Sequence, residues 1–234
     1  MRADTVTPKQ LVRAVEQALT PLADASRAVH MKAYLLDQFE FLGLQAPVRR
    51  QAVKGMGQVQ WQSANDLLKA ADLLWQKPQR EYRYTAVDLL RQHSALLSVG
   101  DLPALQDLLL REPWWETVDG LSAVIAEVMH AAVTRKPNAA KAMDVWLKHP
   151  SHWVRRSAML HQLGWRLDTD TARLFGYAQQ LADEKEFFIR KAIGWALRDY
   201  ARWNPQAVTD FLMQHRAVLS GLTVREAAKH LNLP

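Results

Sequence analysis

The sequence predicts an all-α fold made of repeated helical pairs, and three observations support this prediction. Apolar residues recur at helical spacing, prolines mark helix boundaries, and one short motif returns about every 35 residues. No segment keeps a period-two apolar pattern flanked by turn dipeptides, so no sheet is expected. We therefore expect roughly a dozen helices of moderate length.

Apolar stripes show the helical spacing directly. Residues three and four apart share one face of a helix, so each stripe predicts a helix with one buried side. The clearest stripes are Leu11, Val12, Val15 and Leu19; Leu67, Leu68, Ala71, Leu74 and Trp75; and Leu121, Val124, Ile125, Val128 and Met129. Prolines interrupt the pattern, and several suit the first turn of a helix, where a missing N–H costs nothing. The prolines that interrupt the pattern are Pro8, Pro47, Pro78, Pro103, Pro113, Pro137, Pro150 and Pro205.

The repeated motif reads apolar or aromatic residue, arginine, two variable residues, alanine. It begins at residues 48, 82, 154, 189 and 224, with the copy at 189 looser than the others. The gap between 82 and 154 fits one further copy at 118, where Asp119 replaces the arginine. A period near 35 residues with two helices per unit predicts an α-solenoid of about six repeats, stacked into a curved, C-shaped superhelix.

The motif arginines occupy equivalent positions in successive repeats, and two roles are open for them. They bind the phosphates of a nucleic acid, or they bond carbonyls and acids of the neighbouring repeat. These repeat arginines are Arg49, Arg83, Arg155, Arg190 and Arg225.

Composition limits the classes of function. The chain has 234 residues and a formal net charge of +6, which fits a polyanionic partner and a basic concave face. It contains no cysteine, so disulfides and thiolate metal sites are excluded. The start of the sequence shows no signal peptide, and no apolar run is long enough to span a bilayer. We expect one domain over residues 1–234, in the cytoplasm.

The segment from Pro113 to Asp119 is the first candidate for chemistry. Trp115 and Asp119 are four residues apart and share one helix face. An indole attracts cations, and a carboxylate stabilises developing positive charge or positions a water molecule. The plainer interpretation, favoured for this pair alone, is a core tryptophan beside an aspartate that bonds a neighbouring helix.

A second candidate lies downstream, where Trp195 and Arg198 are three residues apart and share a face. Gly194 costs helix stability, about 1 kcal/mol relative to alanine. A glycine within a helix often permits close packing or close approach. Trp195 on a core face with a solvated Arg198 is the alternative. No histidine or acidic cluster has metal-ligand spacing, so neither a metal nor a cofactor is expected.

These two segments resemble the AlkD-like DNA alkylation repair enzymes, which are alkylpurine DNA glycosylases built of HEAT-like repeats. The resemblance rests on residues 113–119 (PWWETVD) and 191–200 (KAIGWALRDY), in this order and on this period. Tyr34, residues 41–50 (FLGLQAPVRR) and residues 153–158 (WVRRSA) extend it, so that it spans about residues 28 to 230. Glu116 departs from the family's aspartate, at a position that points away from the Trp115 face.

The resemblance implies a glycosylase that removes N3- and N7-alkylated, cationic purines from double-stranded DNA without flipping the base into a pocket. It implies that Trp115 and Trp195 pack on the deoxyribose and the lesion, and that Asp119 stabilises an oxocarbenium ion and orients water. Arg156 and Arg198 are then expected to grip phosphates. The full set of expected DNA-binding residues is Tyr34, Gln45, Arg156, Lys191 and Arg198.

On this reading the protein is a monomeric, cofactor-free enzyme that acts on DNA in the bacterial nucleoid. Two alternatives remain: a non-catalytic HEAT-like module that binds nucleic acid, and a protein-interaction scaffold. Replacing Asp119 by asparagine separates the enzyme from the binder, since a pure binder has no excision activity to lose. A scaffold predicts no steep fall of DNA affinity with salt.

Overall fold

The computed structural model describes residues 6–231, without the side chains of residues 57 and 58. The regular secondary structure of these residues is helical, with no β-strand and one isolated bridge between Glu40 and Gln79. The thirteen α-helices are α1 (Pro8–Leu19), α2 (Ala25–Tyr34), α3 (Ala46–Ala52), α4 (Ala64–Trp75), α5 (Arg80–Gln92), α6 (Leu102–Leu110), α7 (Trp115–Arg135), α8 (Lys141–Trp146), α9 (His152–Leu160), α10 (Thr171–Gln180), α11 (Phe187–Ala201), α12 (Pro205–Gln214) and α13 (Gly221–Ala227). The predicted all-α class is confirmed.

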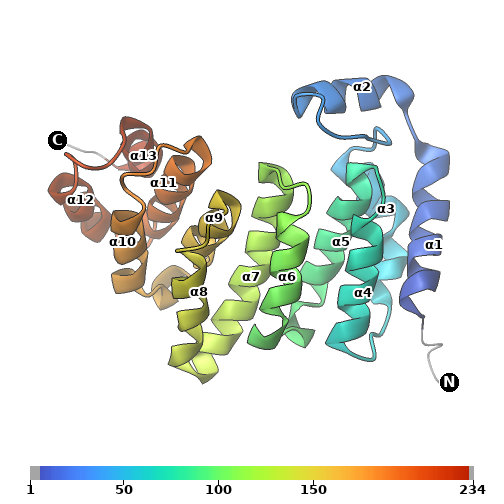
Figure 1. Ribbon diagram of the computed structural model, residues 1–234, viewed down its shortest axis with the longest axis horizontal. Helices are drawn as coiled ribbons and strands as arrows, with labels where there is room; N and C mark the ends of the chain where they lie inside the picture. Colours follow the sequence, from blue (N-terminus) through green and yellow to red (C-terminus); the bar gives the residue numbers. More distant parts are fainter. Residues whose placement is uncertain (1–5, 232–234) are drawn as a thin grey trace. The chain divides into compact units, whose positions relative to one another are not determined.

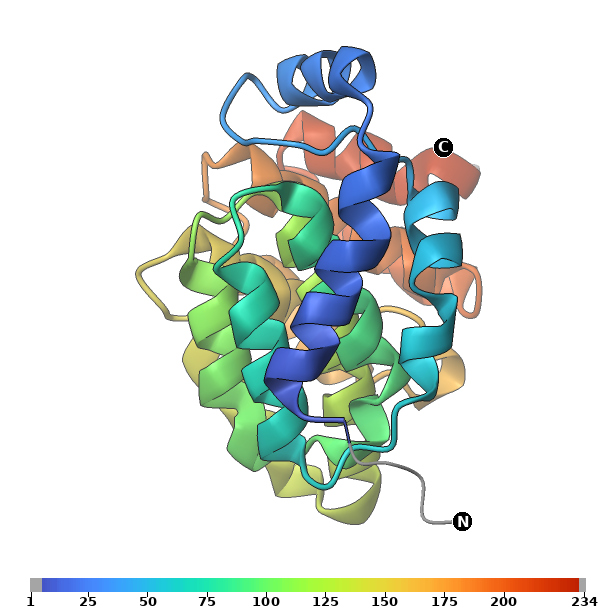
Figure 2. The ribbon, with the colours of Figure 1, turned by 90° about the vertical axis from the view of Figure 1, so that its right-hand side faces the viewer.

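The chain divides into two compact units, Met1–Leu97 and Ser98–Pro234. In the first unit, α1 packs against α4, and α4 pairs with α5 (Figure 2). The apolar stripe predicted for α1 is buried in full, as are Leu67, Ala71, Leu74 and Trp75 of α4. A single domain over residues 1–234 remains a prediction.

A buried carboxylate shapes the loop that leads into α3. Glu81 is fully buried and accepts the backbone N–H groups of Leu42, Gly43 and Leu44 at 2.9, 2.8 and 3.0 Å. Gly43 has φ +89°, and a Cβ there would lie 2.1 Å from the carbonyl oxygen of Asp24. Only glycine fits this turn, because the positive φ and the close carbonyl both exclude a side chain.

In the second unit the helices follow one another as pairs (Figure 1). Helix α6 packs against α7, α8 against α9, and α10 against α11, while α12 also packs against α11. The second helices of the pairs contact each other in succession, α7 with α9, α9 with α11, and α11 with α13. Side chains on these four helices can therefore meet although they lie far apart in sequence.

The repeated motif has the same place in every pair. It begins at the third or fourth residue of α3, α5, α7, α9, α11 and α13, which confirms the repeat deduced from the sequence. Its first residue is buried in the middle repeats, at Val118, Val154 and Ile189. The motif thus marks the start of each second helix, where an apolar side chain enters the core. Among residues 6–231, no helix has the length and apolar character to cross a lipid bilayer.

Candidate active site

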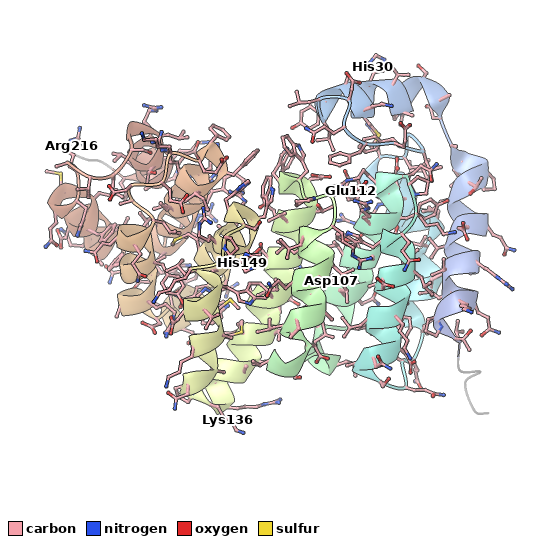
Figure 3. The ribbon with its side chains drawn as sticks, in the orientation of Figure 1. His30, Asp107, Glu112, Lys136, His149 and Arg216 are labelled. Atoms are coloured by element: carbon pink, nitrogen blue, oxygen red, sulfur yellow. The ribbon has the colours of Figure 1, made fainter. Side chains whose placement is uncertain are left out.

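A strained turn sets the start of α7. Glu112 has φ +46°, which is rare outside glycine, and Trp114 is extended with φ −147° and ψ 161°. The sequence had suggested that Pro113 lies in the first turn of this helix. The helix begins at Trp115, so Pro113 instead lies just before it. Figure 3 labels Glu112 and Lys136 near the two ends of α7, and the candidate site lies at the Glu112 end.

Trp115 and Asp119 lie one turn apart on α7, and both are partly exposed. The Asp119 side chain is 22% exposed and receives two hydrogen bonds from one guanidinium, that of Arg156 on α9. The Nε–Oδ1 distance is 2.7 Å and the Nη2–Oδ2 distance is 2.9 Å. This bidentate pair fixes both carboxylate oxygens, because the planar guanidinium allows one orientation only.

Arg156 is turned toward protein in this structure. Its side chain is only 1% exposed, and its Nη1 donates to the carbonyl oxygen of Phe188 on α11. A buried guanidinium that holds a carboxylate and a carbonyl differs from the phosphate-binding arginine expected from the sequence. In this structure Arg156 connects Asp119 on α7 to α11, and its expected contact with phosphate remains a prediction.

Aromatic packing supports this connection. The rings of Trp114, Trp153 and Phe188 meet with centroid distances of 6.0, 5.5 and 4.8 Å. The hydroxyls of Ser122 on α7 and Ser157 on α9 are also buried, 2.7 Å apart. These contacts join the starts of α7, α9 and α11, and they hold the Asp119–Arg156 pair in place.

Trp195 on α11 extends the site. The Arg156 guanidinium carbon lies 5.2 Å from the Trp195 ring centroid, within cation–π range. The indole Nε1 of Trp195 donates to Glu226 on α13 at 3.1 Å. One series of contacts therefore runs from Asp119 through Arg156 and Trp195 to Glu226, with one residue from each of α7, α9, α11 and α13.

Two more of the expected residues surround Trp195. Lys191 and Arg198 are half-buried, and both donate to Glu226, at 2.9 and 3.0 Å. The hydrogen bond from Lys191, together with the nearby Arg198, holds the pKa of Glu226 below its usual range. The structure thus brings Lys191, Trp195 and Arg198 together around one carboxylate.

Glu226 was not singled out from the sequence, although one clue existed. It follows the motif arginine of the last repeat, a position that carries Arg50, Arg156 or Lys191 in other copies. Two further copies carry Tyr84 and Gly120 there. An acid at a position that is basic in three copies, one period after Lys191, predicts a pair between neighbouring helices. Its link to Trp195 needed the structure.

Tyr34 and Gln45 belong to the first unit. Tyr34 ends α2, a helix with no buried residue, and is 73% exposed. Gln45 is exposed at the start of α3, where its extended backbone forms the N-cap. Their expected contacts with DNA remain predictions.

The repeat arginines mainly serve the protein itself. Arg49 and Arg83 are buried, and Arg49 bonds Thr85 and Asp88 at 3.2 and 2.7 Å. Arg155 and Arg190 both donate to Glu184. Arg155 bonds the Glu184 carboxylate, and Arg190 bonds the Glu184 backbone carbonyl. Arg225, in contrast, is exposed. The structural role therefore accounts for Arg49, Arg155 and Arg190, while buried Arg83 lies near the Trp75 ring at 5.9 Å.

The fold and this site define a helical-repeat protein with a carboxylate held beside indole rings. The family described as "DNA alkylation repair enzyme" matches residues 15–231, and the chain belongs to this family. The resemblance noted in the sequence is thereby confirmed, and with it a role in DNA alkylation repair.

Solved structures agree with this assignment. A predicted DNA alkylation repair enzyme from Enterococcus faecalis is 30% identical with a TM-score of 0.81, over 89% of this chain and 96% of that one. AlkD2 from Streptococcus mutans has 19% identity and a TM-score of 0.63, over 97% and 100% of the two chains. The protein smu.31 from Streptococcus mutans UA159 has 18% identity and a TM-score of 0.62, over 95% and 100%. The last two show the shared fold. Comparison with curated protein sequences gives no significant match.

Proposed function

We propose that the protein is a DNA glycosylase that hydrolyses the N-glycosidic bond of N3- and N7-alkylated purines in double-stranded DNA. The observation that carries this proposal is the partly exposed Asp119 carboxylate, fixed by Arg156 on one side of the Trp195 indole. A fixed carboxylate stabilises positive charge without reorganising, which is the largest catalytic effect available to such a site.

The reaction needs little more than this geometry. An alkylated purine carries a positive charge, so it leaves with the bonding electron pair as a neutral base. The C1′–N bond breaks, the sugar acquires oxocarbenium character, and a water oxygen bonds to C1′ as one proton is released. Asp119 faces the sugar cation and orients the water, while Trp115 and Trp195 offer indole faces to the sugar and the base.

We assign the remaining residues by their contacts. Arg156 positions Asp119, since its guanidinium is buried against that carboxylate. Lys191 and Arg198 bind backbone phosphates, because both are partly exposed cations beside Trp195. Tyr34 and Gln45 contribute further DNA contacts from the first unit. No base pocket is required, which agrees with a mechanism that leaves the base unflipped.

Release of the free base tests this proposal. Purified protein is incubated with a duplex that contains 7-methylguanine, and the supernatant is analysed for the free base by mass spectrometry. The wild type is expected to release it. Asp119→Asn keeps the side-chain shape and is expected to lose about 100-fold or more in rate while it still binds DNA.

Asp107 provides a matched control for charge. This aspartate pairs with Arg111 on the surface of α6 and is labelled in Figure 3. Asp107→Asn removes the same charge and is expected to leave excision unchanged. Salt-dependent DNA binding by a wild type that releases no base would instead identify a non-catalytic binder, and binding insensitive to salt would favour a scaffold.

A further inference from the structure

Glu226 on α13 accepts hydrogen bonds from three side chains on one face of α11. Its carboxylate accepts from Lys191 Nζ at 2.9 Å, Trp195 Nε1 at 3.1 Å and Arg198 Nη1 at 3.0 Å. These three donors occupy successive turns of α11, and the Glu226 side chain is 21% exposed. A single acid therefore determines where two cations and one indole point.

Close helix packing supports this arrangement. A Cβ at Gly194 would lie 2.5 Å from the Glu226 Cβ and 3.0 Å from the Thr223 carbonyl oxygen. Thr223 also donates from Oγ1 to the Arg190 carbonyl at 3.1 Å. The backbone of α13 is thus held against α11 at Thr223 and Glu226, which places the Glu226 carboxylate beside its three donors.

The charges around Trp195 explain why an acid is needed here. Three cations lie near the ring centroid, Arg156 at 5.2 Å, Lys191 at 5.5 Å and Arg198 at 5.9 Å. Asp119 offsets the charge of Arg156. Glu226 offsets one further charge, so that the ring surroundings keep an excess of one positive charge.

A cationic base that approaches this ring meets like charges, and repulsion between like charges weakens its binding. An additional uncompensated cation would increase that repulsion. The carboxylate also accepts from the indole N–H, which fixes the plane of the ring that the substrate meets. Glu226 therefore both limits the excess positive charge beside Trp195 and fixes the indole ring.

From these contacts we propose that Glu226 is a positioning residue that adapts the Trp195 site to a cationic substrate, by fixing the indole and by restraining Lys191 and Arg198. This inference rests on the proposed glycosylase function. It predicts that Glu226 raises the excision rate and lowers the DNA affinity. Glu226 supports excision, and it weakens overall DNA binding because its charge repels phosphates and occupies two cations.

The test uses Glu226→Gln in the full chain, which keeps the side-chain size and one acceptor oxygen. Single-turnover excision of 7-methylguanine is expected to slow by roughly ten-fold, because one like charge becomes uncompensated. DNA affinity is expected to rise several-fold. The salt dependence should steepen by about one to two in the slope of log K against log salt, as one or two cations engage phosphates.

A spectroscopic measurement isolates the indole contact. In protein labelled with ¹⁵N-tryptophan, the Trp195 indole N–H signal is identified by its loss in Trp195→Phe. It is expected to move upfield in Glu226→Gln, since an amide oxygen accepts a weaker hydrogen bond than a carboxylate.

Glu184 supplies the matched control. It is a half-buried acid in the same unit, and it pairs with Arg155 at 2.6 Å. Glu184→Gln removes an equal charge and is expected to change neither the excision rate nor the Trp195 signal. Equal effects of the two substitutions on excision would overturn the inference.

The remaining outcomes are also decisive. Glu226→Gln with unchanged excision, or with slower excision and weaker DNA binding, overturns the inference and leaves the glycosylase proposal standing. A wild type that releases no base defeats the glycosylase proposal, and the part of the inference that concerns excision falls with it. The binding measurement then decides the rest, because unchanged affinity in Glu226→Gln shows that the acid does not restrain the two cations.

Discussion

Asp119 and Arg156 form a bidentate ion pair between α7 and α9, with a guanidinium that is 1% exposed and a carboxylate that is 22% exposed. The carboxylate keeps one side open although both oxygens are held. This combination of fixed orientation and access suits the charge-stabilising role that we propose for Asp119.

Arg156→Lys tests the importance of that orientation. Lysine keeps the charge but offers one ammonium in place of a planar fork, so it cannot hold both Asp119 oxygens. We expect excision to fall by about ten- to a hundred-fold and the free energy of unfolding to fall by about 1–3 kcal/mol. Single-turnover rates and urea unfolding measure the two effects.

A control separates orientation from stability. Arg173 on α10 pairs with Asp144 and Asp170, and Arg173→Lys breaks a comparable pair. It is expected to lower stability and to preserve excision. Excision at the wild-type rate in Arg156→Lys would show that bidentate positioning of Asp119 is unimportant.

Gly194 gives a prediction about helix packing. An alanine Cβ there would meet Glu226 and the Thr223 backbone, so α13 must shift. We expect Gly194→Ala to lower the free energy of unfolding by about 1–3 kcal/mol, despite the better helix propensity of alanine. Gly176 in α10 is the matched control, because a Cβ there has no heavy atom within 4 Å.

Urea unfolding of both variants provides the measurement. Gly176→Ala is expected to raise stability by up to about 1 kcal/mol, through propensity alone. If both alanine variants were stabilised alike, the close approach of α11 and α13 would be refuted.

His161 predicts a pH dependence of stability. Its ring is buried, and Nδ1 donates to the Ala158 carbonyl at 2.6 Å. Burial lowers the pKa of His161 to about 4. Between about pH 6.5 and 4, the unfolded chain, with a histidine pKa near 6.5, binds a proton that the folded protein does not bind. The free energy of unfolding therefore falls as pH decreases through this range.

The effect is measured against a variant without the titrating ring. Between pH 7 and pH 5, the wild type is expected to lose about 2 kcal/mol more than His161→Gln in urea unfolding. Above pH 7 the difference should be constant. Parallel pH profiles for the two proteins would mean that the folded state accepts the proton.

Much of the fold could be predicted from local pattern. The stripe of α1 and the apolar residues of α7 are buried as expected, and the motif period located six helix starts. Pro8, Pro47, Pro103 and Pro205 lie in the first turns of their helices. Such features depend on residues within one turn, where spacing determines geometry.

The site was only partly accessible from sequence. The shared face of Trp115 and Asp119, and the close packing at Gly194, follow from helical spacing and glycine chemistry. The choice of partners does not, because Arg155 and Arg156 are neighbours of identical type. One faces Glu184 and the other faces Asp119, and only the packing of α9 against α7 and α11 decides between them.

The central claim is that Asp119 stabilises a cationic sugar, and a comparison of affinities tests it most directly. Two duplexes are compared, one with a protonated pyrrolidine in place of the deoxyribose at the lesion and one with the neutral tetrahydrofuran analogue. A transition-state mimic should bind more tightly to a site built for charge development. We expect the wild type to prefer the cationic duplex by about ten-fold or more, and Asp119→Asn to lose that preference. Equal affinity of the wild type for the two duplexes would contradict the claim.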